Sequence, residues 1–268
     1  MSRVRTNPLK TKQVHGRTNY LIVILFILSL TLNVVQYSQY LALSQGYDQV
    51  RQVELTPPYV SISNGTIKWV FYDLRNDTIT WEMPMNSYRS YVSKDKPVRT
   101  LSLTTAAGLH ITTYDMRPYI QPSFFTNIIP ILTEGRSAED FVREVDNIKN
   151  QIVKYGKGLG EAPYQFPAET LTEGRGACAD TTILMASMLI AGDDQANYGF
   201  KVYIWYVEMN LDGTLFSDSR SITQINHAIV EVQFSDGVTW SLETTTNYLY
   251  TYSQDYTGWQ FDVTTITS

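Results

Sequence analysis

The chain has 268 residues, of which 43% are hydrophobic, and a net charge of -5. This length is ample for a buried core in one or two domains. Because 26 acidic residues stand against 21 basic ones, the composition argues against a nucleic-acid-binding protein, and we expect no nucleic-acid partner.

The charge is unevenly distributed along the chain. The first 17 residues contain five basic residues and no acidic one, which leaves 16 basic against 26 acidic residues beyond them. An apolar run at residues 20–37 follows this basic arm and is long enough to cross the ~30 Å hydrocarbon core of a bilayer. The polar residues Asn33 and Gln36 weaken its far end. Basic residues ahead of an apolar segment predict a cytoplasmic N-terminus.

The sequence therefore predicts residues 1–18 as a cytoplasmic arm and residues 19–37 as a transmembrane signal-anchor helix in the cell membrane. The remainder is then extracytoplasmic, beginning with a stalk at residues 38–58 that two prolines close. A cleaved signal peptide is the second interpretation of the apolar run, and a buried helix of a soluble protein is the third. The sequons at Asn64 and Asn76 are compatible with the outward orientation.

Residues 59–135 are predicted to form a β-rich N-terminal region. Residues 67–72 and 78–81 flank a polar segment, which predicts a hairpin, and residues 99–105 and 109–114 predict a second pair of strands. The prolines that then interrupt regular structure are Pro118, Pro122 and Pro130.

Helical periodicity begins in residues 136–268, which we predict to form a separate domain. Ser137 is a candidate N-cap for an amphipathic helix that ends near Tyr155. A loop rich in Gly and Pro, residues 156–167, leads to a helix that begins at Cys178 and is apolar around most of its circumference. Strands are predicted at residues 200–208, 227–234, 238–243 and 259–263. This order of elements indicates an α+β fold.

Cys178 is the single cysteine, so no disulfide can form within the chain. It opens an apolar helix, where unpaired N–H groups and the helix dipole favour a thiolate. His227 follows 49 residues later and Glu243 sixteen residues after that. This is the order of a thiol nucleophile, its base and the acid that orients the base. The alternative is that Cys178 is a small, inert, buried hydrophobic residue.

Contact between Glu243 and His227 depends on the turn that joins their strands. A two-residue turn at residues 236–237 places the two side chains on opposite faces of the sheet. A three-residue turn, with Gly237 in the left-handed conformation, puts Ile229 opposite Glu243 and makes His227 its diagonal neighbour on the same face. Both registers are open from the sequence.

Several motifs together resemble the transglutaminase-like superfamily. In chain order they are Gly-Ala-Cys-Ala-Asp at residues 176–180, His-Ala-Ile-Val-Glu-Val at 227–232 and Trp-Ser-Leu-Glu-Thr-Thr at 240–245. A further segment at residues 162–171, Ala-Pro-Tyr-Gln-Phe-Pro-Ala-Glu-Thr-Leu, resembles a prokaryotic, mostly archaeal, branch of membrane-anchored transglutaminase-like proteins. The likeness covers about residues 60 to 265.

The resemblance implies a papain-like core, in which the cysteine helix packs on an antiparallel β-sheet. It also implies a cysteine peptidase or a transglutaminase-type acyltransferase, with Cys178 as nucleophile, His227 as general base and Glu243 orienting the histidine. Two features depart from the superfamily pattern: Glu243 stands where most members have Asp, and Ala177 and Ala179 replace acidic neighbours of the cysteine. These departures fit a different substrate, or a site that has lost activity.

The function expected from these observations is a membrane-anchored extracytoplasmic thiol enzyme. It would cleave or transfer at amide or carboxamide bonds of a protein or peptide substrate. An inactive fold that serves as a cell-surface binding or assembly module is the main alternative, and an accessory part of a transporter or sensor is another. We expect no cofactor and no metal, because three scattered histidines and one cysteine do not supply a tetrahedral zinc site. His15 lies in the basic arm, and His110 has no partner at ligand spacing.

Overall fold

The computed structural model describes residues 56–156, 163–210, 214–218, 222–245, 249–250 and 256–267. These residues belong to one compact unit, Thr56–Ser268. The predicted cytoplasmic arm, the predicted anchor and nearly all of the predicted stalk lie outside the described residues. Within the described ranges, no helix combines the length and apolar character needed to cross a membrane.

The described chain starts with an antiparallel three-stranded sheet. It consists of β1 (Tyr59–Ser63), β2 (Thr66–Tyr72) and β3 (Thr78–Pro84). The first predicted hairpin is thus confirmed, with Phe71 opposite Ile79. Helix α2 (Met85–Val92) follows, in a region where the sequence pattern indicated only strands. None of its residues is fully buried, so it lacks the strong apolar stripe that reveals a helix in a sequence.

The second predicted pair of strands is also confirmed, as β4 (Thr100–Thr104) and β5 (His110–Tyr114). Three short helices come next: η1 (Arg117–Tyr119), η2 (Pro122–Phe125) and α3 (Ile129–Thr133). Each has a proline at its first or second position, where the missing N–H needs no partner. The three prolines therefore begin short helices besides interrupting longer ones.

Helix α4 (Ala138–Ile152) begins as predicted, because the Ser137 hydroxyl accepts a hydrogen bond from the N–H of Asp140 at 3.1 Å. Helix α5 (Pro167–Glu173) was not predicted. Its start is capped by Glu169, whose carboxylate accepts from the N–H of Phe166 at 2.7 Å. Two short strands, β6 (Lys154–Tyr155) and β7 (Arg175–Gly176), pair in parallel just before helix α6 (Cys178–Ala196).

A five-stranded antiparallel sheet completes the fold. Its spatial order is β11-β10-β9-β8-β12. The strands are β8 (Lys201–Val207), β9 (His227–Gln233), β10 (Thr239–Leu242), β11 (Leu249–Tyr250) and β12 (Gly258–Asp262). Every neighbouring pair runs antiparallel, and the α+β class is as expected from the sequence.

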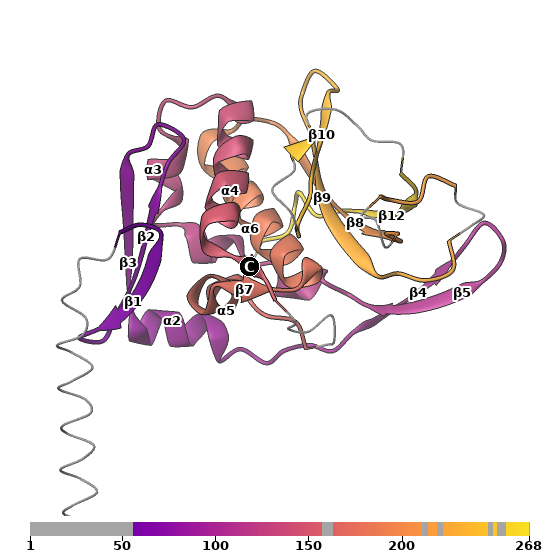
Figure 1. Cartoon of the computed structure of the whole chain (residues 1–268), viewed down its shortest axis with the longest axis horizontal. Helices are drawn as coiled ribbons and strands as arrows, with labels where there is room; N and C mark the ends of the chain where they lie inside the picture. The colour runs from indigo at the N-terminus through magenta and orange to yellow at the C-terminus, as the bar shows by residue number, and fades with distance from the viewer. Residues whose placement is uncertain are drawn as a thin grey trace, which may run out of the picture. The chain divides into compact units, whose positions relative to one another are not determined.

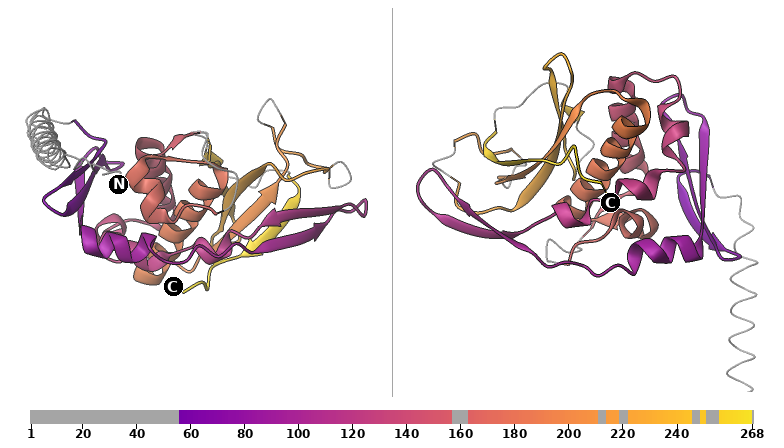
Figure 2. Two further views of the ribbon diagram at one scale, coloured as in Figure 1. Left: turned by 90° about the horizontal axis from the view of Figure 1, so that it is seen from below. Right: turned by 180° about the vertical axis from the view of Figure 1, so that it is seen from behind.

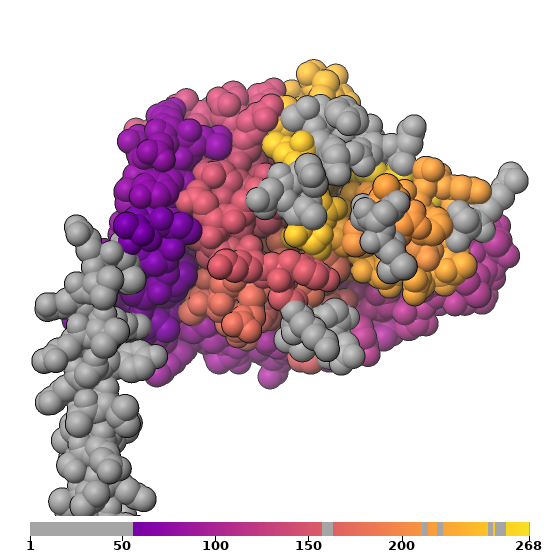
Figure 3. Space-filling view, in the orientation of Figure 1, coloured from indigo at the N-terminus to yellow at the C-terminus, as the bar shows by residue number. Residues whose placement is uncertain are grey.

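The helices lie between the two larger sheets (Figures 1 and 2). Helix α6 packs on β8 and β9, while α4 packs on β2 and on α6. The space-filling view shows the indigo β1–β3 sheet, the helices and the yellow-orange strands side by side on one face (Figure 3). Trp69 and Trp81 stack with ring centroids 4.5 Å apart and join the same core as α4 and α6. One hydrophobic core therefore includes residues from the predicted β-rich region, 59–135, and from the predicted domain at 136–268.

Candidate active site

Cys178 is the first residue of α6 and is partly accessible. Its position is fixed by Asp180, which is fully buried one half-turn further along the helix. One carboxylate oxygen of Asp180 accepts from the N–H of Ala177 at 2.9 Å, and the other accepts from the N–H of Gln165 at 2.8 Å. Asp180 therefore caps the helix and ties the cysteine loop to the chain segment around Gln165.

Burial raises the pKa of Asp180 to about 6, although its two backbone hydrogen bonds act in the opposite direction. The hydrogen bond from the N–H of Ala177 shows that this carboxylate serves as the helix cap. The preceding Gly176 leaves little space, because a Cβ there would come within 3.1 Å of Asp180 and Thr170 side-chain atoms. A small residue is needed for this close approach.

His227 and Glu243 meet at the ends of β9 and β10. His227 is 2% exposed, and its Nε2 lies 3.0 Å from Oε2 of Glu243, which is 7% exposed. The other carboxylate oxygen, Oε1, accepts from the N–H of Thr245 at 2.9 Å and from its hydroxyl at 2.7 Å. The Glu243 carboxylate is thus held between the imidazole of His227 and the donors of Thr245.

The three-residue turn is the one that the chain adopts. Trp240 pairs with Val232, which places Val238 opposite Phe234, and the N–H of Phe234 donates to the Val238 carbonyl at 2.8 Å. Gly237 has a φ of +88°, the left-handed conformation expected for this turn. Of the two registers left open by the sequence, the structure therefore has the one that lets Glu243 reach His227.

The Cys178 thiol completes the series: it lines the same cavity as His227 and contributes to the raised pKa of the imidazole. Because Nε2 faces Glu243, the nitrogen left for the thiol is Nδ1. Burial lowers the pKa of His227, but the hydrogen bonds and charges of Cys178 and Glu243 outweigh it and raise that pKa to about 9. Burial likewise raises the pKa of Glu243, yet the bond and charge of His227 and the donors of Thr245 lower it overall. These opposite shifts favour a charged imidazolium beside a charged carboxylate.

A cavity of about 90 Å³ opens beside Cys178 and His227. Its other walls come from β5, from the segment before α5 and from β8. The residues that form these walls include Thr113, Met116, Tyr164, Tyr206 and Ile225. The Tyr164 hydroxyl donates to the Tyr114 carbonyl at a long 3.4 Å, and burial, with the nearby Cys178, raises the pKa of Tyr164. A hydroxyl that keeps its proton is thus placed in the wall of the cavity.

Three residues near this site were not singled out from the sequence. Tyr164 belongs to the segment that carries the family resemblance, but nothing local indicated that its ring lines the cavity. Tyr155 lies level with Gly176 in the β6–β7 pair and is 63% exposed. Lys149, on α4, donates to the backbone carbonyl of Glu243 at 2.9 Å. Only the assembled fold brings these residues to the cysteine and its partners.

The remaining histidines lie elsewhere. His110 is on β5, where its Nδ1 is 3.0 Å from the Thr104 hydroxyl, and His15 is outside the described residues. Among the residues that the structure describes, no group of three or more His, Cys, Asp or Glu side chains is arranged to hold a metal ion.

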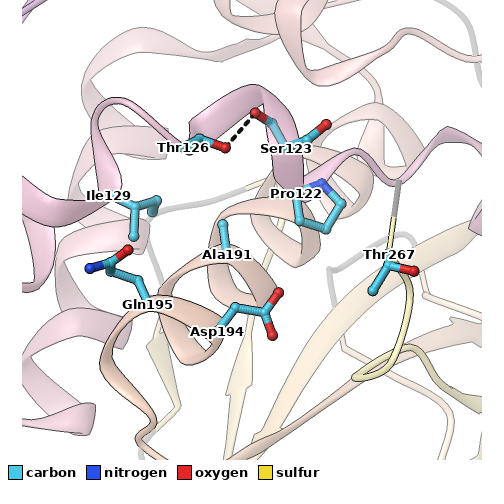
Figure 4. Close-up of a pocket in the computed structure, with 8 residues that line it drawn as sticks. All are labelled: Pro122, Ser123, Thr126, Ile129, Ala191, Asp194, Gln195 and Thr267. Atoms are coloured by element: carbon cyan, nitrogen blue, oxygen red, sulfur yellow. Dashed lines mark hydrogen bonds between the residues drawn. The ribbon is translucent and has the colours of Figure 1, made fainter.

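A wider surface pocket of about 240 Å³ lies beside the C-terminal half of α6 (Figure 4). Its polar groups include Ser123, Thr126, Asp194 and Gln195, and the Thr126 hydroxyl is bonded to the Ser123 carbonyl at 2.8 Å. The lining residues include neither a cysteine nor a histidine. The narrower cavity at the start of α6 is therefore the candidate site for nucleophilic chemistry.

No known family and no curated protein matches the sequence. Among solved structures, the chain is similar to calcium-bound LapG of Legionella pneumophila, with 15% identity and a TM-score of 0.37 over 50% of this chain and 70% of that one. It is also similar to a proposed protease of Parabacteroides distasonis, with 14% identity and a TM-score of 0.35 over 47% of this chain and 24% of that one. A proposed cysteine protease of Cytophaga hutchinsonii has 15% identity and a TM-score of 0.33 over 59% and 66% of the two chains. At these scores, the similarities assign neither a family nor an activity.

Proposed function

We propose that this chain is a thiol enzyme with a transglutaminase-like, papain-like catalytic unit. Cys178 is the nucleophile, His227 the general base and Glu243 the acid that orients the base. The observation that supports this proposal is that His227 is hydrogen-bonded to Glu243 and lines the same cavity as Cys178, whose thiol contributes to the raised pKa of the imidazole. A nucleophile bonded to a base, which is bonded to an orienting group, is the arrangement on which covalent acyl transfer depends.

In the proposed reaction, Nδ1 of His227 takes the thiol proton. The other imidazole proton stays on Nε2, where it is hydrogen-bonded to the Glu243 carboxylate. The thiolate attacks the carbonyl carbon of an amide or carboxamide, and a C–S bond forms as the carbonyl electron pair moves to oxygen. The C–N bond then breaks, and His227 returns its proton to the leaving amine. A thioester on Cys178 remains. Water releases an acid from it, whereas a second amine releases a cross-linked product.

Two donors stabilise the oxyanion in this proposal. One is the backbone N–H of Cys178 at the start of α6, where the helix dipole favours negative charge. The second is the Tyr164 hydroxyl, which lines the same cavity and is weakly bonded to the Tyr114 carbonyl in the free protein. Turning toward a bound substrate would exchange that long bond for a shorter, charge-assisted one.

The substrate in this proposal is a protein or peptide outside the cytoplasm. Residues 19–37 anchor the chain in the membrane, with the basic arm inside and the catalytic unit outside. Protease treatment of sealed cells tests this topology. Loss of the catalytic unit, with the basic arm protected, is the expected result, and full protection of the catalytic unit contradicts the outward orientation.

A thiol probe tests the chemistry without knowledge of the substrate. Because Cys178 is the single cysteine, the rate of alkylation by iodoacetamide reports this site alone. We expect labelling at about pH 6 to be roughly a hundredfold faster than that of free cysteine, and to lose that advantage in a His227→Gln variant.

His110→Gln is the matched control, because His110 is an exposed histidine bonded to Thr104 and not to the cysteine. It is expected to label like the wild type. If Cys178 reacts no faster than free cysteine, or if His227→Gln changes nothing, the enzyme is excluded and a binding or assembly module is the better interpretation.

A further inference from the structure

A second buried ionic pair lies directly behind the catalytic acid. Lys149 is 3% exposed, and its ammonium group lies 3.0 Å from a carboxylate oxygen of Asp146, one turn earlier on α4. The other oxygen of Asp146 accepts from the Asn150 side chain at 2.9 Å. A buried ammonium group is costly unless its charge is paired and its N–H groups are hydrogen-bonded. Asp146 supplies the charge, and Glu243 supplies a further hydrogen-bond acceptor.

The ammonium of Lys149 donates to the main-chain carbonyl of Glu243 at 2.9 Å. This contact joins positions 94 residues apart in the sequence. Glu243 is consequently held at two points: its carbonyl by Lys149, and its carboxylate by the backbone and hydroxyl of Thr245. Held in this way, the carboxylate faces His227, with both oxygens 3.0 Å from Nε2.

Helix α4, which carries Lys149, packs tightly on α6. Phe141, on the same helix as Lys149, packs so closely on α6 that a Cβ at Gly192 would lie 2.1 Å from its ring. Helix α4 therefore has a fixed distance from the helix that begins with Cys178. Because Lys149 on α4 is bonded to the Glu243 carbonyl, the position of α4 also fixes the position of Glu243. Two rigidly packed helices, α4 and α6, thus position both ends of the Cys178–His227–Glu243 series.

We infer that Lys149, anchored by Asp146, is a positioning residue for the catalytic acid. The inference rests on the proposed function, since it assigns a role relative to Cys178, His227 and Glu243. Lys149 acts on the main chain of Glu243 and does not touch the reacting atoms. Of the charged groups described above, His227 faces Glu243 from β9, and Lys149 with Asp146 faces it from α4.

The test is the pH profile of Cys178 alkylation by iodoacetamide in an Asp146→Asn/Lys149→Met variant of the full chain. Changing both residues leaves no unpaired charge, which preserves the fold better than the lysine change alone. If the acid loses its position, the imidazolium loses part of its stabilisation. Alkylation at about pH 6 is then expected to fall about tenfold, as for a change of one pKa unit at His227.

Glu144→Gln is the matched control. Glu144 is also buried on α4 and paired, but with Arg136 at 3.2 Å and with the N–H of Leu74, away from Glu243. Its loss lowers stability without displacing the acid, so the alkylation profile is expected to stay that of the wild type. Circular dichroism of each variant establishes that it is folded. If the double variant does not fold, Lys149→Arg replaces it, because it keeps a positive charge beside Asp146 while its larger guanidinium group shifts the Glu243 carbonyl; the expected decrease is about threefold.

Each outcome decides the question. A folded variant with the wild-type profile overturns the positioning role while leaving the proposed function intact. An equal decrease in the Glu144→Gln control also overturns it, because the effect is then a general loss of stability. If the wild type shows no His227-dependent reactivity, the proposed function itself fails, and the positioning role fails with it.

Discussion

The imidazole of His227 contacts the carboxylate of Glu243 at 3.0 Å, although the β9–β10 hairpin pairs Leu242 with Val230, so that its register, continued by one residue, does not put His227 directly opposite Glu243. The contact is diagonal, and the three-residue turn with Gly237 in the left-handed conformation makes it possible. A slip of one residue would turn the carboxylate to the other face of the sheet. The turn is therefore as important to the site as the two side chains.

Replacement of Glu243 tests this contact. Glu243→Gln retains the size of the side chain but removes its charge, so the pKa of His227 is expected to decrease from about 9 toward its ordinary value. We expect Cys178 alkylation at about pH 6 to slow by tenfold or more. The control is Glu231→Gln, which removes a buried carboxylate from β9, the strand of His227, where it is bonded to Tyr256 and Gln260. A Glu243→Gln rate equal to that of the control would contradict the orienting role.

The stability of the protein should depend on the charge of His227. Its pKa is raised to about 9 in the folded state, so its contribution is fully present below about pH 6.5 and is lost as the pH rises through 9. Urea unfolding of the wild type and of His227→Gln should differ most near pH 6, on the order of 3 kcal/mol, and least above pH 9. A difference that grows toward high pH would show that the histidine is neutral in the fold.

Removal of the Tyr164 hydroxyl should separate thiolate formation from acyl transfer. Alkylation forms no oxyanion, so Tyr164→Phe should leave the iodoacetamide rate unchanged. Acylation of Cys178 by an activated ester does form one, and its rate should fall about a hundredfold. Tyr114→Phe is the control, because it keeps both the carbonyl that accepts from Tyr164 and the ring that packs edge-on against it. Equal loss in both reactions would instead indicate that Tyr164 maintains the cavity.

Replacement of Gly192 by Ala should destabilise the protein, although the same change usually stabilises a helix. A change from Gly to Ala within a helix normally stabilises by about 1 kcal/mol. Here the new Cβ would lie 2.1 Å from Phe141, so Gly192→Ala is expected to destabilise the protein by about 1–3 kcal/mol. Thermal unfolding measures the effect, and Gly192→Ala/Phe141→Leu should be more stable than the single Gly192→Ala variant. No loss of stability in Gly192→Ala would mean that α4 and α6 are further apart.

Much of the fold could be predicted because its signals are local. The N-cap at Ser137, the apolar helix after Cys178 and the alternating strands each appear within a short window of sequence. Helices α2 and α5 were missed for physical reasons. Helix α2 has no fully buried residue, and α5 begins at Pro167 within a segment whose prolines indicate a loop.

The candidate site likewise has features that the sequence predicts and features that only the folded chain shows. The order of Cys178, His227 and Glu243 was visible in the sequence, but the register that joins the last two was not, because both turns fit Asp236 and Gly237. Lys149 gave no signal, and Tyr164 was visible only as part of the segment that resembles the family, since the contacts of both residues are with parts of the chain distant in the sequence. Lys149 and Glu243, for example, are brought together only when α4 packs beside the sheet.

Helix α6 is buried along nearly its whole length and contacts α3, α4, α5 and the central strands β8 and β9. An element enclosed on all sides opens only when the whole fold opens, so its amide hydrogens should exchange with solvent at the rate of global unfolding. Cys178 stands at the end of that helix. The nucleophile is thus attached to the slowest-exchanging part of the molecule, and mild heat or denaturant should abolish its reactivity only when the entire unit unfolds.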